Sequence, residues 1–290
     1  MDLVAVMFPR RILEEKLLKL LAEDVGEGDV TTAAVVPSEC TAEAEVVAKA
    51  DGVVAGIEEA AILAEALGLE VECPVTDGEK VSSSQVLMKL TGDAATILTA
   101  ERTMLNLLSR MSGIATATKN LTEKIRKAKL KTRIAATRKS APGLLYFDKK
   151  AVVVGGGDPH RLHLDDMVLI KDNHIAIAGT MAEAVKHAKQ NASFSKKIEV
   201  EVTTAEDALK AAELGADIVM LDNFSPAKIK ELMKQWEKEN FSDVLLEASG
   251  GITAENLLDY AATGVDVISL GELTHSVKAL DISLEIVSAA

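Results

Sequence analysis

The chain has no excess of positive charge and no long apolar run, and each absence argues against one class of protein. Its 290 residues carry a formal net charge of −13. This charge argues against a general nucleic-acid binder, because such proteins present a basic surface. No apolar run approaches the roughly 18 residues that a membrane-spanning helix needs. We therefore expect a protein that binds neither nucleic acid nor membranes.

Disulfide, zinc and common nucleophile motifs are also missing. Cys40 and Cys73 lack CxxC spacing, so we expect two buried thiols and a cytoplasmic protein. The five histidines show no HExxH spacing, and neither a GxSxG motif nor a P-loop occurs. The apolar start, residues 1–8, has no basic lead-in, so we interpret it as part of a domain rather than a signal peptide.

The first part of the chain mixes helical and strand patterns. Helices are predicted at 11–23 and 58–67, and strands at 43–49, 52–56 and 85–90. This mixture is typical of a small α+β domain, which we place at residues 1–112.

A long helical pattern covers residues 93–127, and we expect Gly113 to end or bend it. The domain junction is placed there. Residues 276–290 have loose helical spacing, and we expect them to pack on the first domain as a separate C-terminal segment.

Short apolar runs alternate with helix-like stretches across residues 113–275, and nearly all of these runs end in a charged, hydroxyl or glycine group. We predict seven strands in this region, within residues 134–139, 151–154, 167–174, 198–201, 218–223, 245–251 and 265–271. This alternation is typical of a (β/α) barrel, in which the carboxyl ends of the strands meet at one mouth. Seven strands leave an open seam that another element must cover.

A glycine-rich turn near the end of this region predicts a phosphate site. Ser249, Gly250 and Gly251 can offer backbone N–H groups, and Thr253 can cap the following helix. Gly271, after the next strand, would complete the site, as in many phosphate-binding barrels. The alternative is that these are two ordinary turns.

Five basic side chains lie at or near the same predicted mouth. Arg138, Lys139 and Lys171 end strands, and His160 and Arg161 follow a glycine triplet. Several fixed cations at one mouth are unfavourable unless a polyanion neutralises them, and Arg and Lys bind carboxylate and phosphate. Each could instead be a solvated surface cation.

Carboxylates on neighbouring strands supply negative charge. Glu201 and Asp222 suit ribose hydroxyls or a Mg²⁺ ion that bridges phosphates. The alternative is that they only pair with lysines. His187 fits a helix surface, whereas the roles of the histidines in loops stay open.

Nine segments, in the same order along nearly the whole chain, resemble the quinolinate phosphoribosyltransferase family, also called nicotinate-nucleotide pyrophosphorylase (carboxylating). They are 26–32 (GEGDVTT), 101–116 (ERTMLNLLSRMSGIAT), 137–144 (TRKSAPGL), 155–161 (GGGDPHR), 169–174 (LIKDNH), 199–202 (EVEV), 220–226 (MLDNFSP), 247–252 (EASGGI) and 273–284 (LTHSVKALDISL).

The resemblance implies an α/β fold: an open seven-stranded (β/α) barrel with an N-terminal α+β sandwich domain. It implies a pentosyltransferase of NAD biosynthesis that joins quinolinate to phosphoribosyl pyrophosphate with Mg²⁺, giving nicotinate mononucleotide, pyrophosphate and CO₂. A homodimer or a dimer-based hexamer with shared active sites is also implied.

Site residues are implied by the same resemblance. Quinolinate carboxylates would contact Arg138, Lys139, His160 and Arg161, with Lys171 between the two substrates. Glu201 and Asp222 would hold the ribose hydroxyls and Mg²⁺, in part through the substrate. The 5′-phosphate would contact Ser249, Gly250, Gly251 and Gly271, with His275 nearby, and Arg102 would reach the neighbouring subunit's site. The catalytic set would be Lys139, Lys171, Glu201 and Asp222.

Departures from the family pattern occur at Leu145, at Asp158 and Pro159, and at His163, and they bear on carboxylate recognition. Two alternative functions remain. One is a sister group tied to molybdenum transport, with another acceptor for phosphoribosyl pyrophosphate. The other is a nucleotide-binding sensor without catalysis, against which the intact catalytic set argues.

Overall fold

The computed structural model describes residues 8–290, which form two compact units. The first unit contains the described residues up to Lys119, together with Pro142–Gly156 and Ser276–Ala290. The second contains Asn120–Ala141 and Gly157–His275. The predicted domain limits at 112 and 275 stay predictions, and most of residues 1–8 lies outside the described part. No described helix is long and apolar enough to cross a bilayer.

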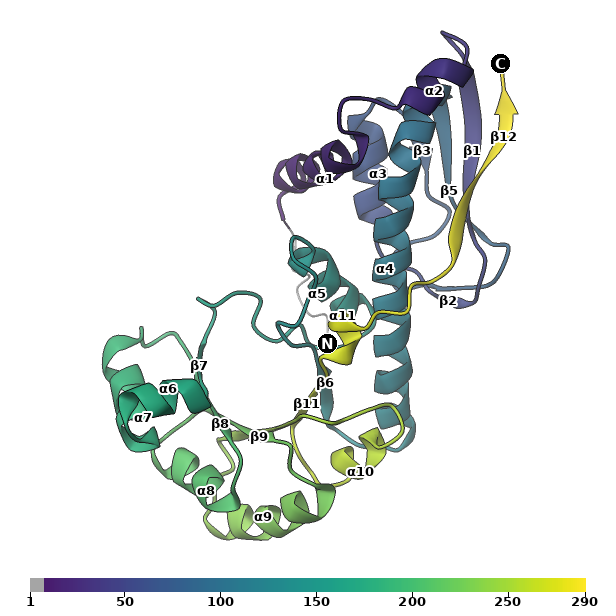
Figure 1. The fold of residues 1–290 in the computed structure, drawn as a ribbon. Helices are drawn as coiled ribbons and strands as arrows, with labels where there is room; N and C mark the ends of the chain where they lie inside the picture. The colour runs from purple at the N-terminus through teal and green to yellow at the C-terminus, as the bar shows by residue number, and fades with distance from the viewer. Residues whose placement is uncertain (1–7) are drawn as a thin grey trace. The chain divides into compact units, whose positions relative to one another are not determined.

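The first unit is built on a four-stranded antiparallel sheet with helices beside it (Figure 1). Along the first strand, Ala42, Ala44 and Val46 are buried whereas Glu43 is exposed, the alternation of a sheet with one covered face. The elements are α1 (Arg10–Val25), α2 (Val30–Val35), α3 (Ile57–Ala66), β1 (Thr41–Ala48), β3 (Glu70–Glu72), β5 (Val86–Asp93) and β12 (Ile282–Ala289), in sheet order β12-β1-β5-β3, with a separate pair β2 (Gly52–Val53) and β4 (Lys80–Val81).

The spacing in segment 276–290 predicts a helix, but the structure shows that the segment ends in strand β12. It pairs with β1 in antiparallel register, Ala44 opposite Ile286 and Val46 opposite Leu284. The apolar residues 282, 284 and 286 also recur every second residue, which is the period of a strand. The period-two pattern predicts the observed strand, and strand β1 supplies the hydrogen-bond partners that β12 needs.

Helix α4 (Ala94–Lys127) runs without interruption through Gly113, so the expectation that the helix ends at this glycine is wrong. A Cβ atom at position 113 would lie 2.3 Å from the carbonyl oxygen of Lys278 and 3.0 Å from Cα of Ala279. The glycine is therefore explained by the close passage of another backbone segment across the helix, not by helix termination.

The second unit is a curved parallel sheet with helices on its outer face (Figure 1). Its six strands stand in the order β6-β11-β10-β9-β8-β7, which leaves β6 and β7 at two open edges. This confirms the α/β class and the open barrel. The strands are β6 (Arg133–Ala135), β7 (Val168–Ile170), β8 (Ile198–Val202), β9 (Ile218–Asp222), β10 (Leu245–Ser249) and β11 (Val267–Ser269), and the helices are α6 (Asp172–Ala178), α7 (Met181–Asn191), α8 (Ala205–Glu213), α9 (Pro226–Lys238), α10 (Leu257–Ala261) and α11 (Glu272–His275).

The strand predicted at 151–154 is wrong, because these residues end helix α5 (Leu145–Val154) of the first unit. A four-residue apolar run does not distinguish a buried strand from a buried helix. The place of a seventh strand is taken by one parallel bridge between Asp158 and Ala135. There the Asp158 N–H donates to the carbonyl of Ile134 at 2.7 Å.

Alternation along the barrel strands separates the core from the site. On β8, β9 and β10, the outward residues Val200, Val219 and Leu246 pack with the helices in one apolar core. The residues between them face the barrel interior. Glutamate, aspartate and serine on these strands are therefore held on a rigid inner face.

The two cysteines are free thiols. Cys73 is exposed and Cys40 is half-buried, so the expected burial of both is wrong. Each lies at the end of a strand of the first unit rather than inside it: Cys40 directly precedes β1 and Cys73 directly follows β3.

Candidate active site

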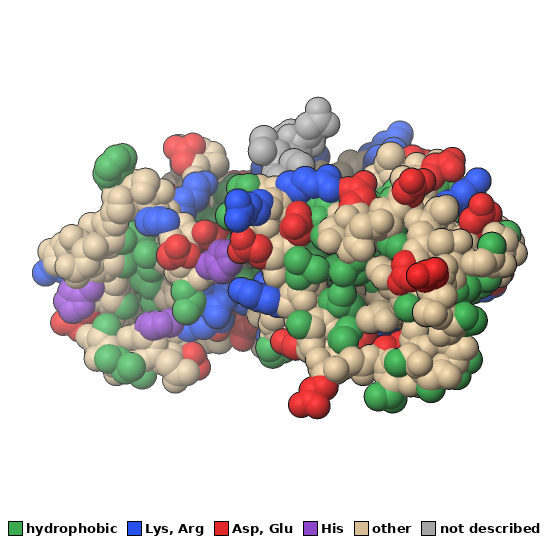
Figure 2. Space-filling model, turned by 90° about the horizontal axis from the view of Figure 1, so that it is seen from above, with side chains coloured by type: hydrophobic (Ala, Val, Ile, Leu, Met, Phe, Trp, Pro, Cys, Tyr) green, Lys and Arg blue, Asp and Glu red, His purple; other side chains and the backbone are tan. Residues whose placement is uncertain are grey.

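A cavity of about 560 Å³ lies at the carboxyl ends of the barrel strands, entirely within the second unit. In the space-filling view, basic, acidic and histidine side chains stand beside one another on the visible face (Figure 2). Predicted site residues that line this cavity are Arg138, Lys139, His160, Arg161, Lys171, Glu201, Asp222, Ser249, Gly250 and Gly251. The remaining lining residues are Ala136, Thr137, Leu169, Met220, Asn223, Glu247 and Ser269.

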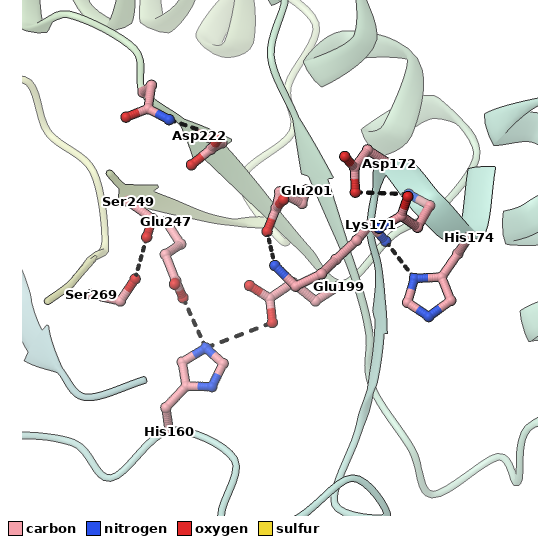
Figure 3. A network of polar contacts seen from close by, with 12 residues as sticks. His160, Lys171, Asp172, His174, Glu199, Glu201, Asp222, Glu247, Ser249 and Ser269 are labelled. Carbon is pink, nitrogen blue, oxygen red and sulfur yellow. Dashed lines mark hydrogen bonds and ion pairs between the residues drawn. The ribbon is translucent and has the colours of Figure 1, made fainter. Parts of the chain in front are cut away.

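Lys171 and Glu201 form an ion pair across the inner face (Figure 3). Lys171 directly follows β7 and is the N-cap of α6, whereas Glu201 lies on β8. Glu201 therefore makes the lysine pair that the alternative expected, and its role toward a substrate stays a prediction. Asp222, at the end of β9, instead accepts a hydrogen bond of 2.9 Å from Nδ2 of Asn223.

The glycine turn after β10 has the backbone expected of an anion-binding loop. Gly250 and Gly251 have φ angles of 89° and 63°, a region that glycine enters without steric cost. The carbonyl of Ser249 accepts from the backbone N–H of Asn223 at 2.8 Å, and its hydroxyl accepts from Ser269 at 3.0 Å. Two neighbouring strands therefore fix the start of this turn.

Thr253 does not cap helix α10, contrary to our expectation. Its hydroxyl accepts from the N–H of Glu255 at 3.3 Å, and the N-cap position of α10 is Asn256. The Asn256 side chain reaches back, accepting from Thr253 N–H at 2.8 Å and donating to the carbonyl of Gly251 at 3.0 Å. The segment between the glycines and α10 is thus a turn that the Asn256 side chain braces.

Gly271 and His275 do not line the cavity but lie beside Lys139, which does. A Cβ atom at Gly271 would be 3.0 Å from Cδ of Lys139 and from Cδ2 of His275. The hydroxyl of Thr274 donates to the Lys139 carbonyl at 2.8 Å. These contacts fix the backbone of Lys139 at the rim of the cavity.

Arg102 belongs to α4 of the first unit, where 62% of its side chain is exposed and Glu101 is 3.6 Å away. Its role in a neighbouring subunit stays a prediction. His163 is exposed, and His187 is exposed on helix α7. His174 lies on α6, where its Nδ1 accepts from the backbone N–H of Lys171 at 3.0 Å.

The sequence reasoning missed two buried glutamates at the cavity, of which Glu247 is one of its lining residues. Glu199 and Glu247 are 0% and 1% exposed, and both point to Nε2 of His160 (Figure 3). The distances from this nitrogen are 3.1 Å to Glu247 and 3.6 Å to Glu199. Burial, and next the charge of Glu247, raise the pKa of Glu199 to about 8. A signal existed, because each glutamate lies two residues before a predicted site residue of the same strand, Glu201 or Ser249.

The guanidinium groups of the cavity lie near one another. Burial, and next the charge of Arg138, lower the pKa of Arg161, although an arginine stays protonated in proteins. Two neighbouring guanidinium groups repel each other unless an anion lies between them. The cavity is therefore electrostatically suited to a ligand with several negative charges.

Comparisons with known proteins agree along almost the whole chain. Residues 29–112 match the family model of the quinolinate phosphoribosyl transferase N-terminal domain, and residues 114–285 match that of the C-terminal domain. The chain belongs to the quinolinate phosphoribosyl transferase family.

Relatives of this family are similar in sequence and in structure. A probable nicotinate-nucleotide pyrophosphorylase [carboxylating] of Methanothermobacter thermautotrophicus is 46% identical over 269 residues, 92% of this chain and 96% of that protein. A quinolinate phosphoribosyltransferase [decarboxylating] of Nicotiana glauca is 41% identical over 96% of this chain and 83% of its own length. The solved nicotinate-nucleotide pyrophosphorylase of Francisella tularensis is 36% identical, with a TM-score of 0.87 over 97% of this chain and 98% of that one.

Proposed function

We propose that this chain is a decarboxylating quinolinate phosphoribosyltransferase, a pentosyltransferase of NAD biosynthesis. It joins quinolinate to phosphoribosyl pyrophosphate and yields nicotinate mononucleotide, pyrophosphate and CO₂. The observation that carries this proposal is one cavity that combines a cluster of cations, a glycine turn and inner-face carboxylates. Family membership supports the same reaction.

The cations suit the two substrates because both are polyanions. Arg138 and Arg161 can each bind a carboxylate of quinolinate through two parallel hydrogen bonds, and Lys139 adds a point charge. The turn at Ser249, Gly250 and Gly251 offers backbone N–H groups to the 5′-phosphate. Gly271 and His275, which lie beside Lys139, are proposed to approach the same phosphate.

Glu201 and Asp222 are proposed to hold the ribose hydroxyls and Mg²⁺. The donors fit this ion, because Mg²⁺ prefers carboxylate oxygen and takes the rest of its ligands from water and substrate phosphates. Bound there, the ion would neutralise the charge of the leaving pyrophosphate. Lys171 lies against Glu201, so it can exchange this partner for a substrate anion.

Catalysis then rests on positioning and charge balance. The lone pair of the pyridine nitrogen forms a bond to the anomeric carbon while the bond to pyrophosphate breaks. The carboxylate next to the ring nitrogen leaves as CO₂, and its electron pair stays on the ring carbon beside the positive nitrogen. A proton from solvent completes the product. Lys139 and Lys171 hold the two anions in place during both steps.

We propose a homodimer, or a dimer-based hexamer, in which Arg102 enters the partner's cavity, and a cytoplasmic location. Support for a shared site comes from the exposed position of Arg102 in the first unit, since a group on α4 is not one of the strand-end groups of its own barrel. The cytoplasm stays a prediction from the sequence.

Release of CO₂ from carboxyl-labelled quinolinate tests the reaction. We expect release that requires both phosphoribosyl pyrophosphate and Mg²⁺. Nicotinate, which lacks the second carboxylate, is the matched control substrate and is expected to react poorly. Equal use of nicotinate would show that the proposed substrate is wrong. No CO₂ release from any pyridine carboxylate would favour one of the two alternatives, a transferase with another acceptor for phosphoribosyl pyrophosphate or a nucleotide-binding sensor without catalysis.

A further inference from the structure

Both ring nitrogens of His160 contact polar groups of the protein. Nδ1 accepts the backbone N–H of Arg161 at 2.8 Å, so this nitrogen carries no proton. The proton of the neutral ring therefore lies on Nε2, which faces Glu247 at 3.1 Å. Only 12% of the side chain is exposed. In this arrangement the imidazole has no remaining N–H group for a substrate carboxylate.

The same arrangement argues against a metal ion. The donor atoms of His160, Glu199 and Glu247 lie within 4.8 Å of one another, as in a metal site. A histidine that binds a metal normally donates a hydrogen bond through its other ring nitrogen. Here the other nitrogen accepts one instead. The geometry fits a hydrogen-bonded imidazole, not a coordinated one.

The backbone at His160 has to be held in place. Its φ of 53° lies in the left-handed region, which is sterically unfavourable for a residue with a side chain. Its N–H donates to the Asp158 carboxylate at 2.7 Å, and Asp158 is itself bridged to Ala135 of the barrel. The next residue is Arg161, which lines the cavity. The conformation of His160 therefore decides where Arg161 enters.

We propose that Glu247 is a positioning residue: by binding the His160 imidazole from strand β10, it fixes the turn that presents Arg161 to the substrate carboxylate. Glu199 lies 3.6 Å from the same ring nitrogen. Its carboxylate is fully buried and accepts no hydrogen bond among the described residues. This proposal rests on the proposed function and reassigns His160 from gripping quinolinate to supporting Arg161.

Steady-state kinetics of Glu247→Ala and Glu247→Gln give the first test. The amide oxygen of glutamine can still accept the Nε2 hydrogen, whereas alanine cannot. We expect Glu247→Ala to raise KM for quinolinate about tenfold, the loss of one supporting hydrogen bond. The change in KM for phosphoribosyl pyrophosphate should be less than about twofold, and Glu247→Gln should restore most of the quinolinate affinity. Equal loss for both substrates, or no rescue by glutamine, would overturn the proposal.

A double-mutant cycle separates positioning from a direct or merely structural effect. If Glu247 acts through Arg161, Glu247→Ala should add less than about twofold to the effect of Arg161→Ala on quinolinate binding. Independent action would multiply the two effects. Leu246→Ala is the matched control, because this neighbour on β10 is buried toward the outer helices. It should lower thermal stability and leave KM for quinolinate unchanged.

A crystal structure of Glu247→Ala gives a measurement that needs no substrate. We expect His160 to leave the left-handed region and the Arg161 side chain to shift away from Arg138. An unchanged segment refutes the proposal even if the enzyme uses another substrate. Failure of the wild-type protein to release CO₂ from quinolinate would instead refute the proposed function, so the two failures are distinguishable.

Discussion

Replacing Gly250 by alanine should damage the phosphate turn much more than the same change at Gly251. Both glycines have positive φ angles, so alanine meets a similar backbone cost of roughly 1–2 kcal/mol at each. The surroundings differ. A Cβ atom at Gly250 would lie 2.4 Å from Oδ1 and 3.0 Å from the backbone nitrogen of Asn223, whereas at Gly251 the nearest atom is Oδ1 of Asn223 at 4.0 Å.

The additional cost at Gly250 follows from what Asn223 holds. Its side chain could rotate away, but this would break the hydrogen bond to Asp222. Its backbone nitrogen cannot move freely, since it donates to the carbonyl of Ser249. Overpacking of this kind costs roughly 1–3 kcal/mol. We therefore expect Gly250→Ala to lose about 2–5 kcal/mol of unfolding free energy, and Gly251→Ala about 1–2 kcal/mol.

The contact also decides how a substitution at Gly250 would lower activity. The added atom would point at Asn223, not into open space where a ligand approaches. The loss of affinity for phosphoribosyl pyrophosphate should therefore come from a displaced turn and a released Asp222 carboxylate. A larger substitution, Gly250→Val, should abolish ribose-phosphate binding for the same reason.

Denaturant unfolding followed by tryptophan fluorescence measures the stability difference. Trp236 is the only tryptophan of the chain and lies buried on α9, so it reports on the barrel unit that contains both glycines. KM for phosphoribosyl pyrophosphate gives the second readout. Gly264→Ala, with φ of 94° and only the end of a methionine side chain at 3.5 Å, is the control away from the cavity. Equal losses for the variants at 250 and 251 would refute the steric argument.

Three further predictions concern charge. Lys139→Ala should raise KM for quinolinate ten- to hundredfold, whereas Asp222→Asn should mainly impair use of phosphoribosyl pyrophosphate; the reverse pattern in substrate titrations would contradict the assigned roles. The pKa of Glu199 is raised to about 8 in the folded protein. Protonation of Glu199 therefore stabilises the fold fully below about pH 4.5, and this contribution is lost as the pH rises through 8. Glu199→Gln should therefore be more stable than wild type at pH 9 by at least about 1 kcal/mol, with the advantage much smaller at pH 5; an equal difference at both pH values in urea unfolding would argue against the shift. Co-refolding inactive Arg102→Ala with inactive Lys171→Ala should restore about a quarter of wild-type activity, because half the dimers are mixed and each has one intact site; no recovery despite proven subunit exchange would place Arg102 in its own subunit's site.

Much of the cavity could be predicted because its residues stand at the ends of short apolar runs. In a parallel barrel all these ends lie on one side, so Lys171 and Asp222 converge although they are far apart in sequence. The glycine turn was predictable for the same reason. Its internal contacts were not, because the contact of Gly250 with Asn223 depends on the register between β9 and β10.

The failures share a different cause. The run at 151–154 and the segment 276–290 are short apolar patterns whose conformation is decided by tertiary partners. Gly113 was interpreted from local propensity, whereas a distant backbone segment explains it. Glu199 and Glu247 were missed because a charged residue is not expected at a buried strand position. Their burial becomes understandable only when a partner such as His160 is known to lie beside them.

The pairing of β1 with β12 has a consequence for biosynthesis. Thr41 and Ala290, which exchange backbone hydrogen bonds, are 249 residues apart in the sequence. A ribosome therefore delivers every segment of the barrel before the first sheet can receive its edge strand. The nascent β1 must wait with one open edge, a surface that invites wrong pairing. We expect the unit that begins first to be completed last, and the waiting period to be the stage at which this chain depends most on chaperones.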